Sequence, residues 1–278
     1  MANCRICDSK QKKFLFRKYD FDIVKCLNCG LYYTDFSPNQ KFAKNFYTKN
    51  YFVRGGKKKS YDDFGKEETS SRITSQKRIK LLKLGKKGSV MDVGCAYGFF
   101  LSEMPDSWNK FGIEISEFAA RIAKKNNPSA NIKNSDMAIN NFFGHKFDLV
   151  TLWDVIEHLD NPKKAVSEVY KVLSKRGKIA LTTGDVDSMI AKTQGLGWHL
   201  YNPPQHLSYF SGTTIKKLLT FVGFKNVTIS HQAAYYPVSY ILHKISNLYG
   251  INMPNYKTFE DWIIPLNLRD IMFVTATK

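Results

Sequence analysis

The sequence predicts an α/β fold in which a seven-stranded sheet is flanked by helices and preceded by a small metal-binding unit. Three observations predict it. Apolar runs of strand length alternate with segments of helical periodicity from residue 66 to 278. The run at 90–93 leads into a turn of small residues and a helix, and the next run ends in an acidic residue. Two closely spaced cysteine pairs precede these elements.

The two cysteine pairs have the spacing of a four-cysteine zinc site. Each pair reads Cys-x2-Cys, and 18 residues separate the pairs. Apolar residues between them predict a short hairpin that turns near Tyr19 and Asp20. A unit this small has little core of its own, so zinc binding would stabilise it, and four thiolates leave no open position for a substrate. We therefore predict a structural zinc ribbon over 1–36. Its expected ligands are Cys4, Cys7, Cys26 and Cys29.

Residues 37–65 are aromatic and basic, and two interpretations of them stay open. Their rings can pack the ribbon onto the main domain, or the segment can be a lid over a substrate pocket. The lid interpretation favours Tyr47, Tyr51 and Phe52, with a hinge at the Gly- and Lys-rich residues 54–59. A helix over 66–84 then opens the main domain, 66–278. Its expected core-facing residues are Ile73, Ile79, Leu81, Leu82 and Leu84.

The first strand, turn and second strand of the main domain predict a nucleoside-binding unit. Small residues in the turn let a ligand approach the backbone closely. An acid ending the second strand can accept hydrogen bonds from both hydroxyls of a ribose. A further acid inside the first strand repels phosphate and suits a cationic ligand; the alternative is an ordinary strand and turn. The residues concerned are Asp92 in the first strand, Gly94, Ala96 and Gly98 in the turn, and Glu114 and Ile115 at the end of the second strand.

Periodicity and capping residues predict the rest of the main domain. Ser116 caps one helix, Pro162 begins another, and Gly223 ends a third. In chain order the expected elements are a helix over 117–125, strands over 130–133 and 147–153, a helix over 162–173, a strand over 178–183, a helix over 213–222, a strand over 225–230, a helix over 238–249 and a strand over 270–277.

The first motif resembles that of the class I S-adenosylmethionine-dependent methyltransferases, hydrophobic-x-Asp-hydrophobic-Gly-x-Gly-x-Gly, with Ala96 in place of the middle glycine. The resemblance implies a Rossmann-like sheet whose seventh strand lies antiparallel beside the fifth, and S-adenosylmethionine as cofactor. It implies that Asp136 bonds the adenine amino group with Met137 alongside the ring, although Asp136 can also cap the next helix. It further implies that Asp154, preceded by Trp153, lies near the sulfonium and amino group of the cofactor.

The segment after the fourth strand carries a candidate general base. Asp154-Val155-Ile156-Glu157-His158 resembles the fourth motif of O-methyltransferases of the ubiquinone-biosynthesis type and of relatives that modify glycans. An imidazole here can take a hydroxyl proton near neutral pH. His158 can alternatively be a structural residue.

An insertion over 184–211 follows the fifth strand, at the edge where open α/β sheets bind ligands. Because it is long, aromatic and rich in histidine, we expect it to form the acceptor pocket. Pro204-x-His206-Leu207-x-x-Phe210 resembles the glycan-modifying relatives, in which this histidine faces the acceptor; it can instead tie the loop to the fifth strand. The motif Asn202-Pro203-Pro204 does not indicate an amino-methyltransferase, since it lies after the wrong strand. The predicted substrate-binding residues are Trp198, His199, Tyr201 and Tyr209, and the predicted base is His158 or His206.

These features predict methyl transfer to a hydroxyl, or a carbon, of a sugar in a nucleotide- or lipid-linked glycan precursor. The sugar acceptor follows from the resemblance to methyltransferases of surface-polysaccharide pathways. A hydroxyl of a quinone or other small aromatic is the second choice. Two other interpretations stay open: an RNA methyltransferase that binds through the ribbon and the basic first third, and a non-catalytic module that only binds the cofactor.

The formal net charge of +18 is concentrated near the amino terminus, where residues 1–88 hold 22 Lys and Arg against 8 Asp and Glu. Such charge suits phosphate groups, but lysines in loops without interleaved aromatic residues are also typical of a solvated surface. We therefore do not predict a nucleic-acid partner, although the charge leaves one open. The absence of a long apolar run and of a signal-peptide pattern predicts a cytoplasmic protein. The oligomeric state is not predicted.

Overall fold

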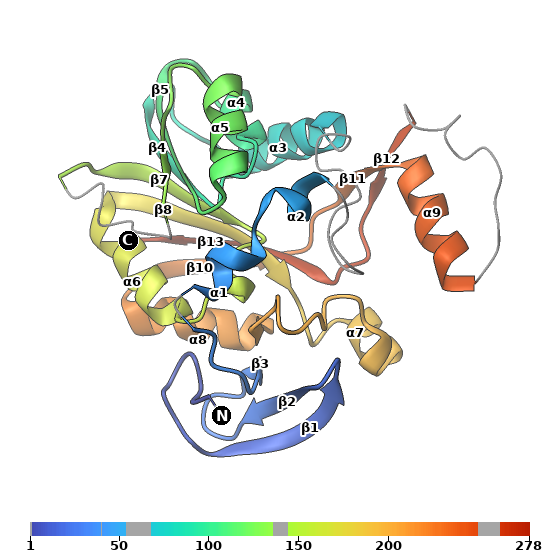
Figure 1. The fold of residues 1–278 in the computed structure, drawn as a ribbon. Coiled ribbons are helices and arrows are strands. Elements are labelled where there is room, and N and C mark those ends of the chain that lie inside the picture. Colours follow the sequence, from blue (N-terminus) through green and yellow to red (C-terminus); the bar gives the residue numbers. More distant parts are fainter. Residues whose placement is uncertain (1, 40, 54–67, 136–143, 250–261) are drawn as a thin grey trace.

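The computed structural model describes residues 2–39, 41–53, 68–135, 144–249 and 262–278 (Figure 1). Its centre is a seven-stranded sheet with the order β10-β13-β8-β7-β4-β5-β6. The strands of this sheet are β4 (Gly88–Val93), β5 (Trp108–Glu114), β6 (Asn131–Asn134), β7 (Phe147–Trp153), β8 (Leu173–Gly184), β10 (Lys225–Ser230) and β13 (Ile271–Thr277). Helices that pack on it are α3 (Glu68–Leu82), α4 (Phe99–Glu103), α5 (Glu117–Asn126), α6 (Pro162–Val172) and α8 (Gly212–Val222).

Successive residues of the central strands enter two different cores, because side chains alternate between the faces of a sheet. Met91 and Val150 pack in the core that contains α6 and α8. Val90 and Leu149 pack in the core that contains the end of α3 and residues of α4 and α5. Figure 1 shows these two helix layers on opposite sides of the sheet. The central strands are apolar throughout because both of their faces are covered.

The predicted sheet is confirmed, including the place of its last strand. β13 lies between β8 and β10 and is antiparallel to both, whereas β4, β5, β6, β7 and β8 are parallel to their neighbours within that group. Two details differ from the expectation. β8 begins at Leu173 instead of Lys178. Leu81 of α3 is exposed while Leu82 is buried, because the buried side of α3 runs through Ser70, Thr74, Ser75 and Leu82, and Leu81 lies outside it.

The ribbon and the insertion form one small sheet, with the order β1-β2-β3-β9. The predicted hairpin is present, and it turns at Tyr19 and Asp20, which both have positive φ. The fourth strand comes from the insertion and pairs antiparallel with β3. The bounds of these strands are β1 (Lys12–Lys18), β2 (Phe21–Cys26), β3 (Tyr32–Thr34) and β9 (Ser208–Tyr209).

Several elements were not predicted or lie beside the main sheet. Two short helices in the aromatic segment cross in front of the strand ends, between the ribbon and α5 (Figure 1). Across the described ranges, no helix combines the length and apolarity needed to cross a membrane. The predicted residues Asp136 and Met137 and the predicted hinge over 54–59 lie outside the described residues. The remaining elements are α1 (Phe42–Phe46), α2 (Lys49–Val53), η4 (Ile156–His158), α7 (Met189–Gln194), η5 (Gly195–Gly197), β11 (Ala234–Pro237), α9 (Val238–Tyr249) and β12 (Ile263–Leu266).

Candidate active site

The turn after β4 presents bare backbone at the carboxyl end of the sheet. Gly94, Ala96 and Gly98 have φ values of 73°, 47° and 78°. A Cβ on Gly94 would lie 2.6 Å from Val155 Cγ2, and one on Gly98 would lie 2.4 Å from Asn127 Nδ2. Both positions therefore require glycine for space as well as for φ. Ala96 adopts the left-handed region at a cost of about 1 kcal/mol.

Glu114, at the end of β5, fastens this turn to the sheet. Its Oε2 accepts a hydrogen bond from the backbone N–H of Ala96 at 2.9 Å, and its Oε1 accepts one from Ser116 N–H at 2.8 Å. Burial raises the pKa of Glu114, while these N–H bonds oppose the rise. A carboxylate offers about four lone-pair positions. Each oxygen can therefore accept a further hydrogen bond from a ligand.

Asp92 is a buried acid in β4, and only 2% of its surface is exposed. Its Oδ1 accepts a hydrogen bond from Thr151 Oγ1 of β7 at 2.6 Å. Burial raises the pKa of Asp92 to about 7, and the Thr151 bond and the charge of Arg78 oppose this rise. The protein groups around Asp92 thus offset only part of the cost of burying its charge, and a cationic ligand would stabilise the ionised carboxylate.

Asp154 directly follows β7 with a φ of 55°, and its backbone N–H donates to Thr182 Oγ1 of β8 at 3.0 Å. Arg78 of α3 lies over the ring of Trp153, 4.6 Å from its centroid, and its Nη2 is 3.5 Å from Asp154 Oδ2. This arrangement puts a guanidinium at the strand ends, where it can bind a carboxylate. Sequence reasoning missed Arg78, because no motif separates it from the other basic residues of its helix.

Both histidines predicted as candidate bases lie together with a buried carboxylate. One ligand atom each of Glu157, His158 and His206 lies within 4.8 Å of the others, and the two imidazole rings meet edge to face at 4.7 Å. The Nδ1 of His158 is 3.0 Å from the carbonyl oxygen of Gln205, and the Nδ1 of His206 is 2.7 Å from that of Leu200. A carbonyl oxygen can only accept, so each Nδ1 carries the hydrogen and each Nε2 keeps its lone pair.

Burial sets the protonation of this cluster. It lowers the pKa of His158, and it lowers that of His206 well below the usual value, with the charge of His158 adding to the effect. Burial raises the pKa of Glu157 to about 8, with repulsion from Asp154 adding and a hydrogen bond from Thr183 opposing. The imidazoles are therefore neutral at pH 7. Their Nε2 atoms can accept a proton or bind a metal ion.

The described part of the aromatic segment covers these strand ends. The Tyr47 ring lies 6.0 Å from the His158 ring. The hydroxyl of Tyr51 accepts a hydrogen bond from Gln205 Nε2 at 2.7 Å, and Phe52 stacks on an aromatic ring of the turn after β4. The three residues named by the lid interpretation thus contact both sides of the site, an arrangement that the packing interpretation also allows.

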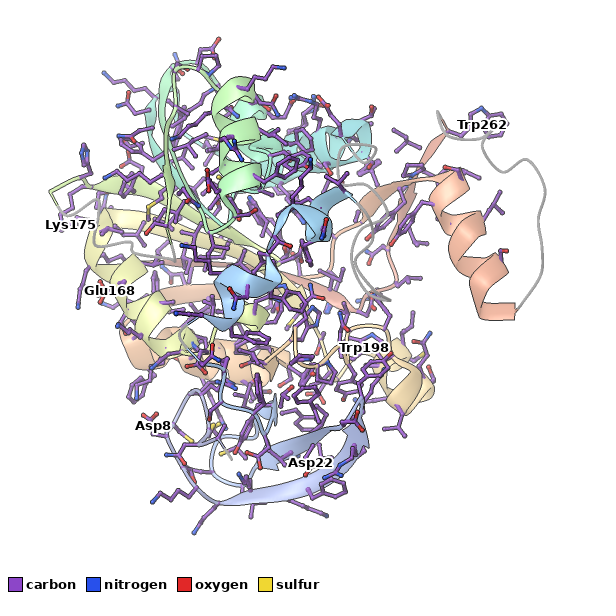
Figure 2. All side chains as sticks on the ribbon, viewed as in Figure 1. Asp8, Asp22, Glu168, Lys175, Trp198 and Trp262 are labelled. Carbon is purple, nitrogen blue, oxygen red and sulfur yellow. The ribbon has the colours of Figure 1, made fainter. Side chains whose placement is uncertain are left out.

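The aromatic residues of the insertion are mainly buried. Trp198, Tyr201 and Tyr209 form a core with β2 and the insertion, and Figure 2 shows Trp198 among the side chains between the ribbon strands and the large sheet. Trp198 Nε1 donates to Asp270 Oδ2 at 3.1 Å. Trp198 and Tyr209 also line a small cavity beside the histidine cluster, whereas the side chain of His199 is 58% exposed.

The four ribbon cysteines gather around one point. Cys4 Sγ lies 3.3 Å from Cys29 Sγ, Cys7 Sγ lies 3.5 Å from Cys26 Sγ, and all four sulfurs lie within 4.8 Å of one another. A zinc ion with Zn–S bonds of about 2.3 Å needs sulfurs about 3.8 Å apart. The backbone turns at Gly30, with a φ of 88°. The donor set and its geometry therefore fit a tetrahedral ion.

The ribbon also holds the loop that carries His206. Thr34 Oγ1 donates to the carbonyl oxygen of His206 at 2.8 Å. The buried Arg5 donates through Nε to the carbonyl oxygen of Leu207 at 3.2 Å and through Nη1 to that of Asp160 at 2.8 Å. These long-range bonds join the ribbon to the two segments that supply the histidine cluster. These bonds could not be predicted from the sequence, because neither Thr34 nor Arg5 belongs to a motif.

Comparison with known proteins decides the family. A family model described as a methyltransferase domain matches residues 67–229, which is more than half of the chain. The chain belongs to this family. The methyltransferase is 28% identical over 168 residues to an uncharacterized protein of Methanocaldococcus jannaschii, covering 60% of this chain and 79% of the relative. It is 25% identical over 158 residues to the ubiquinone biosynthesis O-methyltransferase of Idiomarina loihiensis, covering 52% of this chain and 64% of that enzyme.

Solved structures support the same fold. The YcgJ protein of Bacillus subtilis superposes with a TM-score of 0.56 at 13% identity, covering 74% of this chain and 98% of that one. A SAM-dependent methyltransferase of Archaeoglobus fulgidus superposes with a TM-score of 0.53 at 17% identity, covering 77% and 99%. The family match makes the protein an S-adenosylmethionine-dependent methyltransferase, and the solved structures share its predicted sheet. These comparisons leave a glycan acceptor unsupported.

Proposed function

We propose that this methyltransferase transfers the methyl group of S-adenosylmethionine to a hydroxyl group, and that the Glu157, His158 and His206 cluster prepares that hydroxyl. The observation that carries the proposal is the pair of neutral imidazoles at the carboxyl end of β7, beside the strand ends that carry the cofactor motif. The cofactor supplies a methyl group already activated by its sulfonium. The chain must then align the acceptor oxygen and remove one proton.

The residues at the strand ends would hold the cofactor in one orientation. Glu114 has lone pairs left for the ribose hydroxyls. Asp92 and Asp154 would offset the positive charge of the amino and sulfonium groups, and the Arg78 guanidinium would bind the methionyl carboxylate. The turn from Gly94 to Gly98 would let the nucleoside approach the backbone. Asp136, Met137, Trp153 and Ile115 complete the proposed set from the family resemblance.

The acceptor we favour is a sugar hydroxyl on a nucleotide- or lipid-linked precursor, the same proposal that the sequence suggested. The aromatic and histidine-rich insertion supports a small acceptor, and the net charge of +18 suits a phosphate-bearing one. Trp198, His199, Tyr201 and Tyr209 remain the proposed acceptor residues. A hydroxyl of a small aromatic is a second candidate, favoured by the likeness to the ubiquinone biosynthesis O-methyltransferase.

A panel of acceptors tests this function. S-adenosylhomocysteine formation would be measured with nucleotide-sugars, lipid-linked sugars, catechol-type aromatics and a structured RNA. We expect turnover with a sugar, and a loss of about 100-fold or more in His158→Ala or His206→Ala, the usual size of a general-base effect. His145→Ala, which removes an exposed imidazole before β7, is the matched control. Near wild-type turnover in both cluster variants would refute the assignment, and methylation of RNA alone would move the acceptor site to the basic first third.

We also propose that the ribbon over 1–36 binds one structural zinc ion through its four cysteines, in front of a covering segment over 37–65 and the methyltransferase domain over 66–278. The sulfur geometry supports the ion. The hydrogen bonds from Arg5 and Thr34 favour a role for the ribbon in holding the loop that carries His206.

A further inference from the structure

The cluster of Glu157, His158 and His206 has the composition and build of a metal site. It offers two imidazoles and one carboxylate, with ligand atoms within 4.8 Å of one another. Two histidines and a glutamate form a known catalytic zinc set, and two histidines with a carboxylate also bind other first-row metals. All three side chains approach from fixed backbone, since η4 carries two of them and the strand β9 begins two residues after the third.

The groups that hydrogen-bond to the cluster are also arranged as in metal sites. A metal-binding histidine nearly always donates its other ring N–H to a carbonyl or carboxylate, which fixes the ring and its tautomer. Here both Nδ1 atoms meet backbone carbonyl oxygens, at 3.0 Å for His158 and 2.7 Å for His206. The hydroxyl of Thr183 donates to Glu157 Oε2 at 3.0 Å and orients the carboxylate. Each ligand therefore has an orienting partner, and each Nε2 is left for an ion.

An independent observation points to a missing partner at this place. Ser208 is fully buried, and among the residues that the structure describes its Oγ has no hydrogen-bond partner. It lines the same small cavity as Glu157 and His206. A buried hydroxyl without a partner costs about 1–3 kcal/mol, so this site calls for a polar occupant. A water or hydroxyl carried by a metal ion would supply that partner.

We propose that Glu157, His158 and His206 hold a divalent first-row metal ion, at a site separate from the four cysteines. Binding of the ion does not depend on the proposed acceptor chemistry, but its role does. In that role the acceptor hydroxyl is a further ligand, and the charge of the ion lowers the pKa of the hydroxyl. The proton leaves to solvent, the oxygen lone pair forms the new bond to the methyl carbon, and the electrons of the carbon–sulfur bond return to sulfur. The imidazoles then act as ligands, and the ion replaces them as the agent of deprotonation.

Metal binding is tested first, without any acceptor. The protein would be loaded with Zn²⁺ and dialysed, its zinc content measured, and Mn²⁺ then titrated in while the electron paramagnetic resonance of free Mn²⁺ is followed. Thiolates select zinc whereas carboxylate-containing sites accept Mn²⁺, so Mn²⁺ reports on the histidine cluster. We expect either a second zinc per chain or saturable Mn²⁺ binding. His206→Ala and Glu157→Gln should weaken that binding by about 100-fold or more, since losing even an outer-shell partner costs about 10–100-fold.

Two controls make the result decisive. His145→Ala should bind the second ion like the wild type, and affinity for S-adenosylhomocysteine should be unchanged in every variant, which shows that each is folded. The proposal is overturned if neither Zn²⁺ nor Mn²⁺ binds beyond the cysteine-held ion. It is equally overturned if the second ion binds as tightly in His206→Ala and Glu157→Gln as in the wild type.

Turnover separates this inference from the proposed function. With an accepted substrate, removing the second ion should abolish methyl transfer and restoring Mn²⁺ or Zn²⁺ should recover it. The second ion can bind as expected while no hydroxyl acceptor is methylated. That result would refute the proposed function and support the metal site. Methyl transfer that persists in protein holding only the cysteine-bound ion would overturn the catalytic role of the second ion and leave the proposed function standing.

Discussion

The cofactor half and the acceptor half of the site are built in opposite ways. In the cofactor half, the bonds that shape the turn after β4 are short in sequence: Glu114 reaches Ala96 across 18 residues and Ser116 across 2. Those that shape the acceptor half are long: Tyr51 meets Gln205 across 154 residues, and Thr34 meets the His206 carbonyl across 172. The turn and its acid thus belong to one βαβ unit, while Arg78 and Asp154 join the cofactor half from outside it. The acceptor half exists only when the ribbon, the covering helices and the insertion meet.

This difference has a functional consequence. A site formed within one supersecondary unit keeps its geometry as long as that unit is folded. A site assembled from distant segments depends on every interface between them. Changes far from the acceptor should therefore damage acceptor turnover and spare cofactor binding, whereas changes in the turn after β4 should damage both.

The largest effect is expected from the ribbon. In Cys26→Ser/Cys29→Ser the zinc should be lost and the ribbon should unfold, which removes the support of Thr34 for His206. Acceptor turnover should fall by about 100-fold or more, because a displacement of about 1 Å suffices for that. Calorimetry should show unchanged affinity for S-adenosylhomocysteine. Cys95→Ser, the matched control outside the ribbon, should keep its zinc. An equal loss of cofactor affinity in the ribbon variant would contradict the separation of the two halves.

An effect of similar size is expected from the loss of Glu114. Glu114→Ala leaves the N–H groups of Ala96 and Ser116 without their acceptor and removes the carboxylate proposed for the ribose. Each lost bond to a charged group is worth about 1.5–3 kcal/mol, so affinity for S-adenosylhomocysteine should fall by about 100-fold or more. His206→Ala should keep that affinity in the same titration. If the two variants lose cofactor affinity alike, the halves are not independent.

Asp92→Asn should change how stability depends on pH. Burial raises the folded-state pKa of Asp92 to about 7 from a usual 3.8. The stability that Asp92 contributes is fully present below the unfolded pKa and is lost as pH rises to about 7, because the unfolded chain releases the proton first. Asn keeps an acceptor for Thr151 without the charge. In urea unfolding of the ligand-free protein, the variant should gain up to a few kcal/mol over the wild type at pH 8 and little at pH 4.

The same variant should bind S-adenosylhomocysteine and S-adenosylmethionine more weakly, since it lacks the charge proposed to offset the cationic amino group. A stability difference that does not vary between pH 4 and pH 8 would show that the buried carboxylate carries no such cost.

The smallest effect is expected at Ala96, which replaces the middle glycine of the turn after β4. Ala96 has a φ of 47°, so Ala96→Gly should relieve about 1 kcal/mol of backbone strain, reduced by the added freedom of the unfolded chain. Gly98→Ala should act in the opposite direction, because its Cβ would meet Asn127. Thermal unfolding of the two variants compares them. A lower melting temperature for Ala96→Gly would show that the alanine methyl packs favourably enough to outweigh its φ.

Most of the fold was predictable because its signals are local. Apolar runs identified the strands of the large sheet, and the predicted cap at Ser116 and the predicted start at Pro162 agree with the helices that follow them. Predictions were wrong where the local sequence does not tell a buried residue from an exposed one. Leu81 has the same apolar character as Leu82 but faces solvent, since only the packing of α3 decides which side of the helix is buried. The short strand β9 was missed because it exists only as a partner of β3.

The sequence by itself determined the cofactor turn, the acid at the end of β5, the cysteine pairs and both histidine candidates, because each motif lies within one short segment and follows from strand, turn and ligand chemistry. Only the tertiary structure decided that His158 and His206 are neighbours, that Glu157 completes them, that Arg78 reaches Asp154, and that Thr34 and Arg5 of the ribbon hold the insertion. The physical reason is that these contacts join segments whose proximity is set by burial of shared cores. No residue type or spacing along the chain encodes that proximity.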